Sequence, residues 1–352
     1  MLEKESVYKN TGLCARCKVC REVCESPVPK TVMPVCPSGM TYKFDSYYGS
    51  GRVTIARKYM EGVFEYNDSL AKLVYSCTLC GACHVQCPIM GFDPVEVTRY
   101  LREEAVGKGF ADKFYSLPEG QRLKYESQAD SDVGLLVGCT NSGDEALVKN
   151  VADLLTAAGI KFKTVSFSTG GFLKRKGDED AFAKVREQTT ADLNAAGIKK
   201  LIVYSPLAYS TLLSHYELGG LEVVFYLDCL TDIPFKALPA AKKAAYHDPS
   251  YLGRFTNYHD APRQVLGKIG NMELVEFKRT KENTLCSSAL PDCDEKIVAE
   301  VSSQRLAEAA DLGVEMIVTS CWNCKNTLNK QAEAENSPIL AVEMAELLVG
   351  LL

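Results

Sequence analysis

Residues 77–88 read CTLCGACHVQCP, and the cysteines Cys77, Cys80, Cys83 and Cys87 have the spacing C-x2-C-x2-C-x3-C, followed by proline. Three cysteines that are each two residues apart lie on one tight loop whose amide groups turn inward. Their thiolates can therefore reach three irons of one cubic cluster, while backbone N–H groups donate to its sulfurs. The spacing predicts an iron–sulfur centre and leaves the last cysteine of the run free to reach elsewhere.

The same spacing occurs a second time, in residues 14–24, which read CARCKVCREVC. In two-cluster ferredoxins the last cysteine of each such run binds the cluster of the other run. Two full runs with one spacing argue against structural zinc, which is the usual interpretation of a lone CxxC pair. The sequence predicts two [4Fe–4S] clusters, one held by Cys14, Cys17, Cys20 and Cys87 and the other by Cys77, Cys80, Cys83 and Cys24.

The sequence does not decide which cysteine is the fourth ligand of the second cluster. Cys87 is followed by Pro88, but in the first part of the chain it is Cys36, and not Cys24, that precedes a proline. The spacing favours Cys24 as the ligand, and the following proline favours Cys36. If Cys24 is the ligand, we expect Cys36 to be a small, buried apolar residue.

The residues between the two runs have a helical pattern. Apolar side chains recur at helical intervals at Ile55, Tyr59, Val63 and Phe64, and an Asn-Asp pair marks the start of a second helix. Small ferredoxins join their runs by short strands instead. The pattern therefore predicts a helical ferredoxin module, which we place at residues 1–125.

The composition limits the class of protein. The chain has 352 residues, 46% of them hydrophobic, and a formal net charge of −5, without any block of basic residues, so we expect no nucleic-acid partner. We find neither a signal peptide nor an apolar stretch long enough to span a membrane, and we expect a cytoplasmic chain that contacts membranes only through a partner. Fifteen cysteines without an export signal favour cluster or metal ligation over disulfides.

From about residue 130, predicted strands and helices alternate, which indicates parallel sheets with crossover helices. The pattern restarts after residue 241, so the sequence predicts two copies of one α/β unit, at residues 126–240 and 241–352. Functional groups in such sheets gather at the carboxyl ends of the strands, where Cys139 stands. The copies align with Ser205 opposite Cys321, Ala208 opposite Cys324, Cys139 opposite Ser250, and STGG (168–171) opposite CSSA (286–289).

Three stretches of the second copy carry a family resemblance: HDPSYLGR (247–254), ENTLCSSAL (282–290) and VTSCWNCKNTL (318–328). They resemble the cysteine-rich CCG domain of the B-type and D-type subunits of heterodisulfide reductase (HdrB and HdrD), and of related iron–sulfur subunits of glycolate and lactate oxidation. With a helical ferredoxin in front, the layout resembles HdrD over almost the whole chain. Related HdrD-like subunits also occur in benzoyl-CoA reductase complexes.

The chain departs from this family at two positions. The resemblance implies that an intact motif supplies five thiolates to a noncubane cluster that can act on disulfides. Here Ser250 and Ser287 stand where the motif has cysteines, and Cys286, Cys321 and Cys324 remain. Ligands that a noncubane cluster needs are therefore missing.

The remaining thiols leave three alternatives open. Cys286, Cys321 and Cys324 suit a third iron–sulfur cluster, a zinc ion, or no metal at all. A bound metal would take Cys293 or Cys139 as a further ligand.

The expected function is electron transfer. Clusters with interlocked ligands lie close together, so we expect an iron–sulfur component of a multi-subunit oxidoreductase that relays single electrons to a terminal acceptor. The resemblance implies flavoprotein or iron–sulfur partners that are HdrA-like or similar to electron-transferring flavoprotein. The alternative is a catalytic component that reduces a disulfide or a quinone at a modified C-terminal iron–sulfur or zinc centre. No catalytic residue is singled out.

Overall fold

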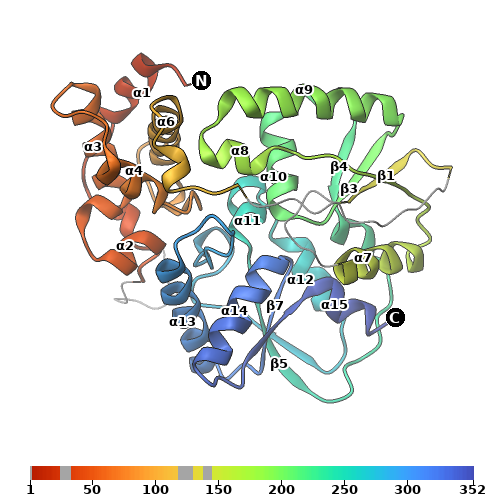
Figure 1. Ribbon diagram of the computed structural model, residues 1–352. Coiled ribbons are helices and arrows are strands. Elements are labelled where there is room, and N and C mark those ends of the chain that lie inside the picture. Colours follow the sequence, from red (N-terminus) through yellow and green to blue (C-terminus); the bar gives the residue numbers. More distant parts are fainter. Residues whose placement is uncertain (1, 24–32, 118–129, 138–144) are drawn as a thin grey trace.

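The computed structural model describes residues 2–23, 33–117, 130–137 and 145–352. A helical N-terminal part lies beside two α/β units, and each unit contains one four-stranded sheet (Figure 1). This confirms the expected fold class. Two of the candidate ligands, Cys24 and Cys139, lie outside the described residues.

The N-terminal part is helical between and around the cysteine runs. Its elements are α1 Lys4–Thr11, η1 Val19–Arg21, α2 Pro37–Tyr42, η2 Asp45–Tyr47, α3 Gly49–Met60, α4 Asp68–Tyr75, α5 Ala82–Val85, α6 Pro94–Gly107 and η3 Ala111–Lys113. Asn67 caps α4 by accepting a hydrogen bond from the N–H of Leu70 (3.1 Å), and Asp93 caps α6 in the same way. Helices α1, α3, α4 and α6 bury one common apolar core.

One detail of the helical pattern is wrong. Helix α3 ends at Met60, because Gly62 adopts a left-handed backbone conformation (φ +75°). Val63 and Phe64 therefore lie beyond the helix, and Val63 is 64% exposed. The helical spacing of apolar residues continues beyond Gly62 in the sequence, although the helix has already ended at Met60.

The rest of the described chain forms two sheets in which all neighbouring strands are parallel. The first unit consists of β1 Val133–Leu136, α7 Glu145–Ala157, β2 Lys163–Val165, α8 Gly171–Lys176, α9 Glu179–Ala196, β3 Lys200–Val203, α10 Pro206–His215, β4 Glu222–Phe225 and η4 Tyr226–Leu230. The second consists of β5 Lys242–His247, α11 Ser250–Thr256, α12 Asp260–Leu266, β6 Met272–Val275, η5 Lys281–Asn283, α13 Glu295–Asp311, β7 Met316–Thr319, α14 Trp322–Ala334, β8 Leu340–Glu343 and α15 Met344–Val349.

The two units are copies of each other in topology. The strand order is β2-β1-β3-β4 in the first sheet and β6-β5-β7-β8 in the second, so each follows the same path. Ser205 and Cys321, which the sequence alignment of the two copies pairs, also have the same role in the structure. Each residue caps its helix by accepting the N–H of the residue three positions on, Ala208 or Cys324, and both contacts measure 3.4 Å. The internal repeat inferred from the sequence is therefore present in the structure.

The three parts of the chain are packed together by apolar and polar contacts. One continuous core includes side chains of both sheets, among them Phe225 of β4 and Tyr246 of β5. On the helical side, Tyr42 donates to Asp294 (2.5 Å), and Arg279 donates to the carbonyl of Pro34 (2.8 Å). The helical part is thus held against the second unit.

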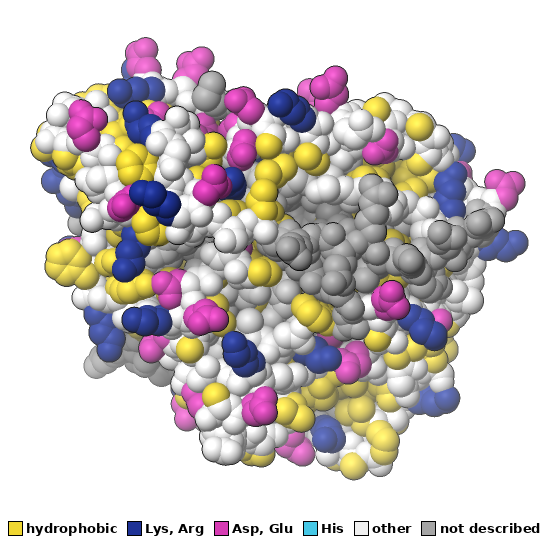
Figure 2. Space-filling model, in the orientation of Figure 1, with side chains coloured by type: hydrophobic (Ala, Val, Ile, Leu, Met, Phe, Trp, Pro, Cys, Tyr) yellow, Lys and Arg dark blue, Asp and Glu magenta, His cyan; other side chains and the backbone are white. Residues whose placement is uncertain are grey.

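The surface carries charges of both signs. On the face drawn in Figure 2, Lys and Arg side chains are interspersed with Asp and Glu, without a continuous field of one sign. In the ranges that the structure describes, no helix has the length and apolar character needed to cross a membrane.

Candidate iron–sulfur sites and the thiol pocket

The first cysteine run lies in the loop after α1 and in η1. Its backbone takes positive φ values at Arg16 (56°) and Lys18 (68°), which coils the loop tightly. Cys17 is exposed and Cys20 is buried. Among the described residues of this run, only the short helix η1 is a regular element.

Cys87 of the second run lies near the thiols of the first run. Burial raises the pKa of the Cys87 thiol, and the neighbouring thiols of Cys17, Cys20 and Cys14 raise it further. These four residues form the first cysteine set.

The remaining cysteines of the second run gather around Cys36. Burial raises the pKa of Cys83 well above its usual value, and Cys77, Cys36 and Cys80 add to the shift because they lie close by. Burial also raises the pKa of Cys36 to about 12, against the charge of Arg52. The described part of the chain thus brings Cys36, the alternative crossing ligand, to the second run.

Three arginines hold the backbone of the second run from three different elements. Arg102 of α6 donates to the carbonyl of Cys77 (2.5 Å), Arg175 of α8 donates to that of Thr78 (2.9 Å), and Arg254 of α11 donates to that of Cys80 (3.2 Å). Each carbonyl is satisfied by a cationic donor, which is stronger than a neutral one. The helical part and both α/β units therefore meet at this loop.

The charge of these arginines is largely uncompensated. Arg175 forms an ion pair with the buried Asp292 (2.6 Å). Within the described ranges, the hydrogen bonds of Arg52, Arg102 and Arg254 go to carbonyl and hydroxyl groups and to no carboxylate. Arg52 and Arg102 are each only 1% exposed, and the buried Nε of Arg102 has no partner in this part of the chain.

Unpaired buried cations require a buried anion nearby. A cubic cluster with four thiolates is such an anion, because the thiolates outweigh the positive charge of the iron–sulfur core. The donor set and the surrounding charge both fit a [4Fe–4S] cluster at the second run.

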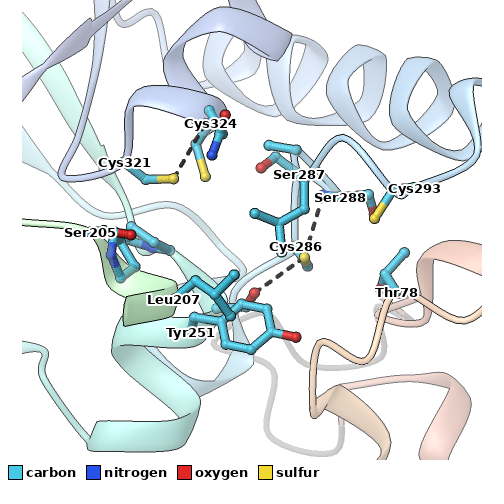
Figure 3. A pocket seen from close by; sticks show the side chains of 16 residues that line it. Thr78, Ser205, Leu207, Tyr251, Cys286, Ser287, Ser288, Cys293, Cys321 and Cys324 are labelled. Carbon is cyan, nitrogen blue, oxygen red and sulfur yellow. Dashed lines mark hydrogen bonds between the residues drawn. The ribbon is translucent and has the colours of Figure 1, made fainter. Parts of the chain in front are cut away.

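Cys286 lies directly against the second run. Its side chain is 8% exposed and packs with Cys80 in a small apolar cluster. Its sulfur lies 3.3 Å from the hydroxyl of Ser250. The same sulfur accepts the N–H of Ser288 (3.3 Å), and Figure 3 shows this contact. A hydrogen bond with Cys80 and, more weakly, the contacts to Ser250 and Ser288 and the charge of Arg254 lower the pKa of Cys286 to about 6.

Cys321 and Cys324 form a second thiol pair at the start of α14. The hydrogen bond between the two thiols lowers the pKa of Cys321 and raises that of Cys324. Ser287 hydrogen-bonds to Cys324. Both serines that stand at motif cysteine positions thus contact a surviving thiol.

The surviving thiols line a small cavity of about 40 Å³ between the two units. This is room for a few water molecules. Ser205 and Leu207 come from the first unit, Tyr251 from the second, and Thr78 from the second cysteine run (Figure 3). The cavity therefore lies next to the loop that the arginines hold, and its thiol lining consists of Cys286, Cys293, Cys321 and Cys324.

The described C-terminal cysteines do not lie together as the ligands of one metal ion. Cys293 lies near Cys77 and accepts a hydrogen bond from Arg175 (3.6 Å). Among the described residues, no three Cys, His, Asp or Glu side chains meet closely enough to hold one metal ion. A cube spreads its ligands over separate irons, so this observation bears on zinc and not on the clusters of the two runs.

Sequence reasoning missed the arginines. Arg52, Arg102, Arg175 and Arg254 are single residues on separate helices, and no motif spacing connects them. Only the packing of the three parts brings them to one loop.

Comparison with known proteins supports the two halves of the layout separately. Residues 10–90 match the 4Fe-4S dicluster domain, and residues 244–329 match the Cysteine-rich domain, CCG. The D subunit of the dihydromethanophenazine:CoB–CoM heterodisulfide reductase of Methanosarcina barkeri is 24% identical over 78% of this chain and 76% of its own length. The resemblance expected from the sequence is confirmed.

Two other relatives are oxidoreductases. EtfAB:quinone oxidoreductase of Syntrophomonas wolfei is 28% identical over 79% of this chain, and the probable iron-sulfur-binding oxidoreductase FadF of Bacillus subtilis is 24% identical over 81%. The chain spans about half the length of these two relatives, 46% and 48%.

A solved structure shares the fold. A hypothetical protein from Helicobacter pylori superimposes with a TM-score of 0.59 at 14% identity, over 99% of this chain and 77% of its own. This likeness concerns the fold alone.

Proposed function

We propose that this chain, an HdrD-like iron–sulfur protein, relays single electrons between a redox partner and a terminal acceptor. The observation that supports the proposal is which thiols are neighbours of Cys87 and of Cys83. Cys87 of the second run lies with the first run, and Cys36 from the first part of the chain lies with the second. A [4Fe–4S] cluster bound at each set accepts and releases one electron at a time.

The proposed ligands follow from these neighbourhoods. We propose that the first cluster is held by Cys14, Cys17, Cys20 and Cys87, and the second by Cys77, Cys80 and Cys83 together with Cys36. Cys24, which the spacing favours, lies outside the described residues and stays the alternative to Cys36. The proposed domains are residues 1–125, 126–240 and 241–352.

The two clusters have different tasks in this proposal. The first run has an exposed cysteine, Cys17, so its cluster is the one that a partner protein can approach. The second run is enclosed by the arginines and by the α/β units, and it adjoins the thiol-lined cavity. The chain therefore connects a surface contact with an interior site.

The proposed partners are a flavoprotein or another iron–sulfur protein. The names of the relatives include one component of a heterodisulfide reductase and an EtfAB:quinone oxidoreductase. By analogy with these names, we infer that this chain works within a larger complex, and we propose the cytoplasm as its location.

The iron content and electron capacity of the anaerobically purified chain test the relay. We expect about eight irons per chain and uptake of two electrons in a reductive titration followed by EPR. Fewer irons, or a capacity of one electron, would contradict a two-cluster relay. Proteins that co-purify under the same conditions would identify the partner.

The thiol-lined cavity favours a second candidate, the reduction of a disulfide or a quinone at a C-terminal centre. This candidate requires metal beyond the two clusters, in the form of about twelve irons per chain or one zinc. The same analysis of purified protein separates it from the relay. A metal content fully explained by two clusters excludes such a centre.

A further inference from the structure

We propose that the loop of the first cysteine run is a docking surface for an acidic redox protein, whose carboxylates meet Arg16 and Lys18 on either side of the exposed Cys17. This inference rests on the proposed function, because it assumes that the first cluster exchanges electrons with a partner. It adds the surface on which that partner binds and the charge that the partner carries.

The loops of the two runs have the same backbone conformation at equivalent positions. In the first run, φ is positive at Arg16 (56°) and Lys18 (68°). In the second run, φ is positive at Leu79 (50°) and Gly81 (79°), which have the same places relative to the cysteines. The surroundings of the two loops can therefore be compared position by position.

The second α/β unit covers this side of the second loop. Leu79 is 1% exposed, and a Cβ atom added to Gly81 would lie 3.1 Å from the ring of Phe255 in α11. The equivalent residues of the first loop, Arg16 and Lys18, are exposed. The side that packs against another part of the chain in the second run is thus open to another protein in the first.

The backbone at these open positions does not favour long side chains. A positive φ suits glycine, and other residues adopt it at a cost in free energy. Burial offsets this cost for Leu79, whereas Lys18 gains only an ion pair with Asp45 (3.6 Å) in which both side chains are at least 60% exposed. Such exposed pairs contribute little, and among the described residues Arg16 forms no ion pair. Cations kept at positions of backbone strain therefore indicate a function.

The charges determine which partner fits. Arg16, Lys18 and Arg21 line an open hollow of about 290 Å³ whose lining contains one carboxylate, that of Asp45. The cations remain in excess when the neighbouring exposed Glu22 is counted. A cluster with four thiolates is itself negative and repels another negative electron carrier. Cations beside the cluster offset this repulsion and attract the carboxylates of an approaching protein.

The test measures how fast two reduced donors of opposite charge reduce the anaerobically purified full chain. The donors are a small acidic ferredoxin and the methyl viologen radical cation, and each passes one electron to the oxidised chain. Stopped-flow absorbance gives the second-order rate constants at low and high salt. The variant is Arg16→Gln/Lys18→Gln. Its matched control is Lys149→Gln/Lys199→Gln, which removes the same charge from exposed sites of the first α/β unit.

We expect the ferredoxin to reduce the Arg16→Gln/Lys18→Gln variant about tenfold more slowly than the unmodified chain at low salt. The difference should shrink at about 0.5 M salt, where the solution screens exposed charges over a few ångströms. Methyl viologen should not react more slowly, because the removed cations repel it. The control should behave as the unmodified chain with both donors.

A second variant, Lys18→Gly, gives the first loop the glycine that the second loop has at Gly81. It removes one cation and also relieves the backbone, so we expect unchanged iron and no loss of thermal stability. Its reduction by the ferredoxin should still be slower at low salt. This variant keeps the test decisive if Arg16→Gln/Lys18→Gln loses iron.

The outcomes separate this inference from the relay. Equal rates with the ferredoxin in variant and control would overturn the docking surface. So would an equal slowing with both donors, which would mean that the cations act on the reduction potential of the cluster. Reduction of the unmodified chain by methyl viologen and not by the ferredoxin would overturn it as well. Fewer than eight irons, or no reduction by either donor, would count against the relay itself.

Discussion

The two cysteine runs have the same spacing but opposite surroundings. The first lies in a surface loop, where Cys17 is exposed and the nearby Arg21 forms its ion pair with an Asp45 that is 64% exposed. The second is enclosed, and Arg102 and Arg175 hold its carbonyls with side chains that are at most 3% exposed. The same cysteine spacing thus lies beside a surface ion pair in the first run and beside buried arginines in the second.

This difference shows which property comes from the spacing and which from the surroundings. The spacing places three thiols of each run on one short stretch of chain. Solvent screens the charges around the first run, whereas buried charges around the second act at low effective dielectric. We therefore expect the two clusters to respond differently to the same kind of substitution.

The largest effect is expected from removing the crossing ligands. Cys87→Ala should remove the first cluster and Cys36→Ala the second, each with a loss of about four irons per chain. Iron analysis and EPR of the anaerobic proteins measure this. Cys24→Ala is the matched control and should keep both clusters; loss of iron in Cys24→Ala together with full iron in Cys36→Ala would reverse the assignment.

A smaller effect is expected from a pair of matched arginine variants. Arg254→Gln removes a charge next to Cys80, and Arg21→Gln removes one next to Cys20. A half-exposed charge at this range contributes about 1 kcal/mol, which is roughly 40 mV for a one-electron couple. We expect Arg254→Gln to lower the potential of the second cluster by this order.

Arg21→Gln is the matched variant, and it tests whether the surroundings of a run affect the reduction potential of its cluster. Arg21→Gln should shift the first cluster by less, since the carboxylate of Asp45 already offsets that charge, whereas the described hydrogen bonds of Arg254 go only to carbonyls. Equal shifts in redox titrations of the two variants would show that the enclosure of the second run has no electrostatic consequence.

The effect most distant from the clusters concerns pH and the sheet of the second unit. Glu343 is 2% exposed, and burial raises its pKa to about 7 from a usual value of 4.5. The group stabilises the fold relative to the unfolded chain below pH 4.5, and this contribution is lost as pH rises through 7. Between about pH 5.5 and 8 we expect the free energy of unfolding to fall by about 2 kcal/mol from this group.

Denaturant titrations of wild-type protein and Glu343→Gln at several pH values measure this slope. Glutamine keeps the shape without the charge, so the pH slope should flatten in the variant. Arg254 and Cys286 tie the second run to this unit, and iron of the second cluster should therefore be released earlier at about pH 8 than at about pH 6. A wild-type slope that survives in Glu343→Gln would assign the pH dependence to other groups.

Much of the architecture could be predicted because it follows from local patterns. The alternation of strands and helices and the repeat were readable, down to the matching caps Ser205 and Cys321. The end of α3 was not, because the apolar spacing continued past Gly62. The arginines around the second run were not predicted either, since each belongs to a different helix.

The sequence by itself determined the donor chemistry of this protein: two runs of thiols at cluster spacing, an α/β repeat, and serines at two positions where the related motif has cysteines. Those features depend on neighbours along the chain, and residue order encodes them directly. Only the tertiary structure brought Cys36 to the second run, set three arginines on its carbonyls, and placed Cys286 against Cys80. These contacts join residues far apart in the chain, and they form only when the helical part and the two units bury their surfaces against one another.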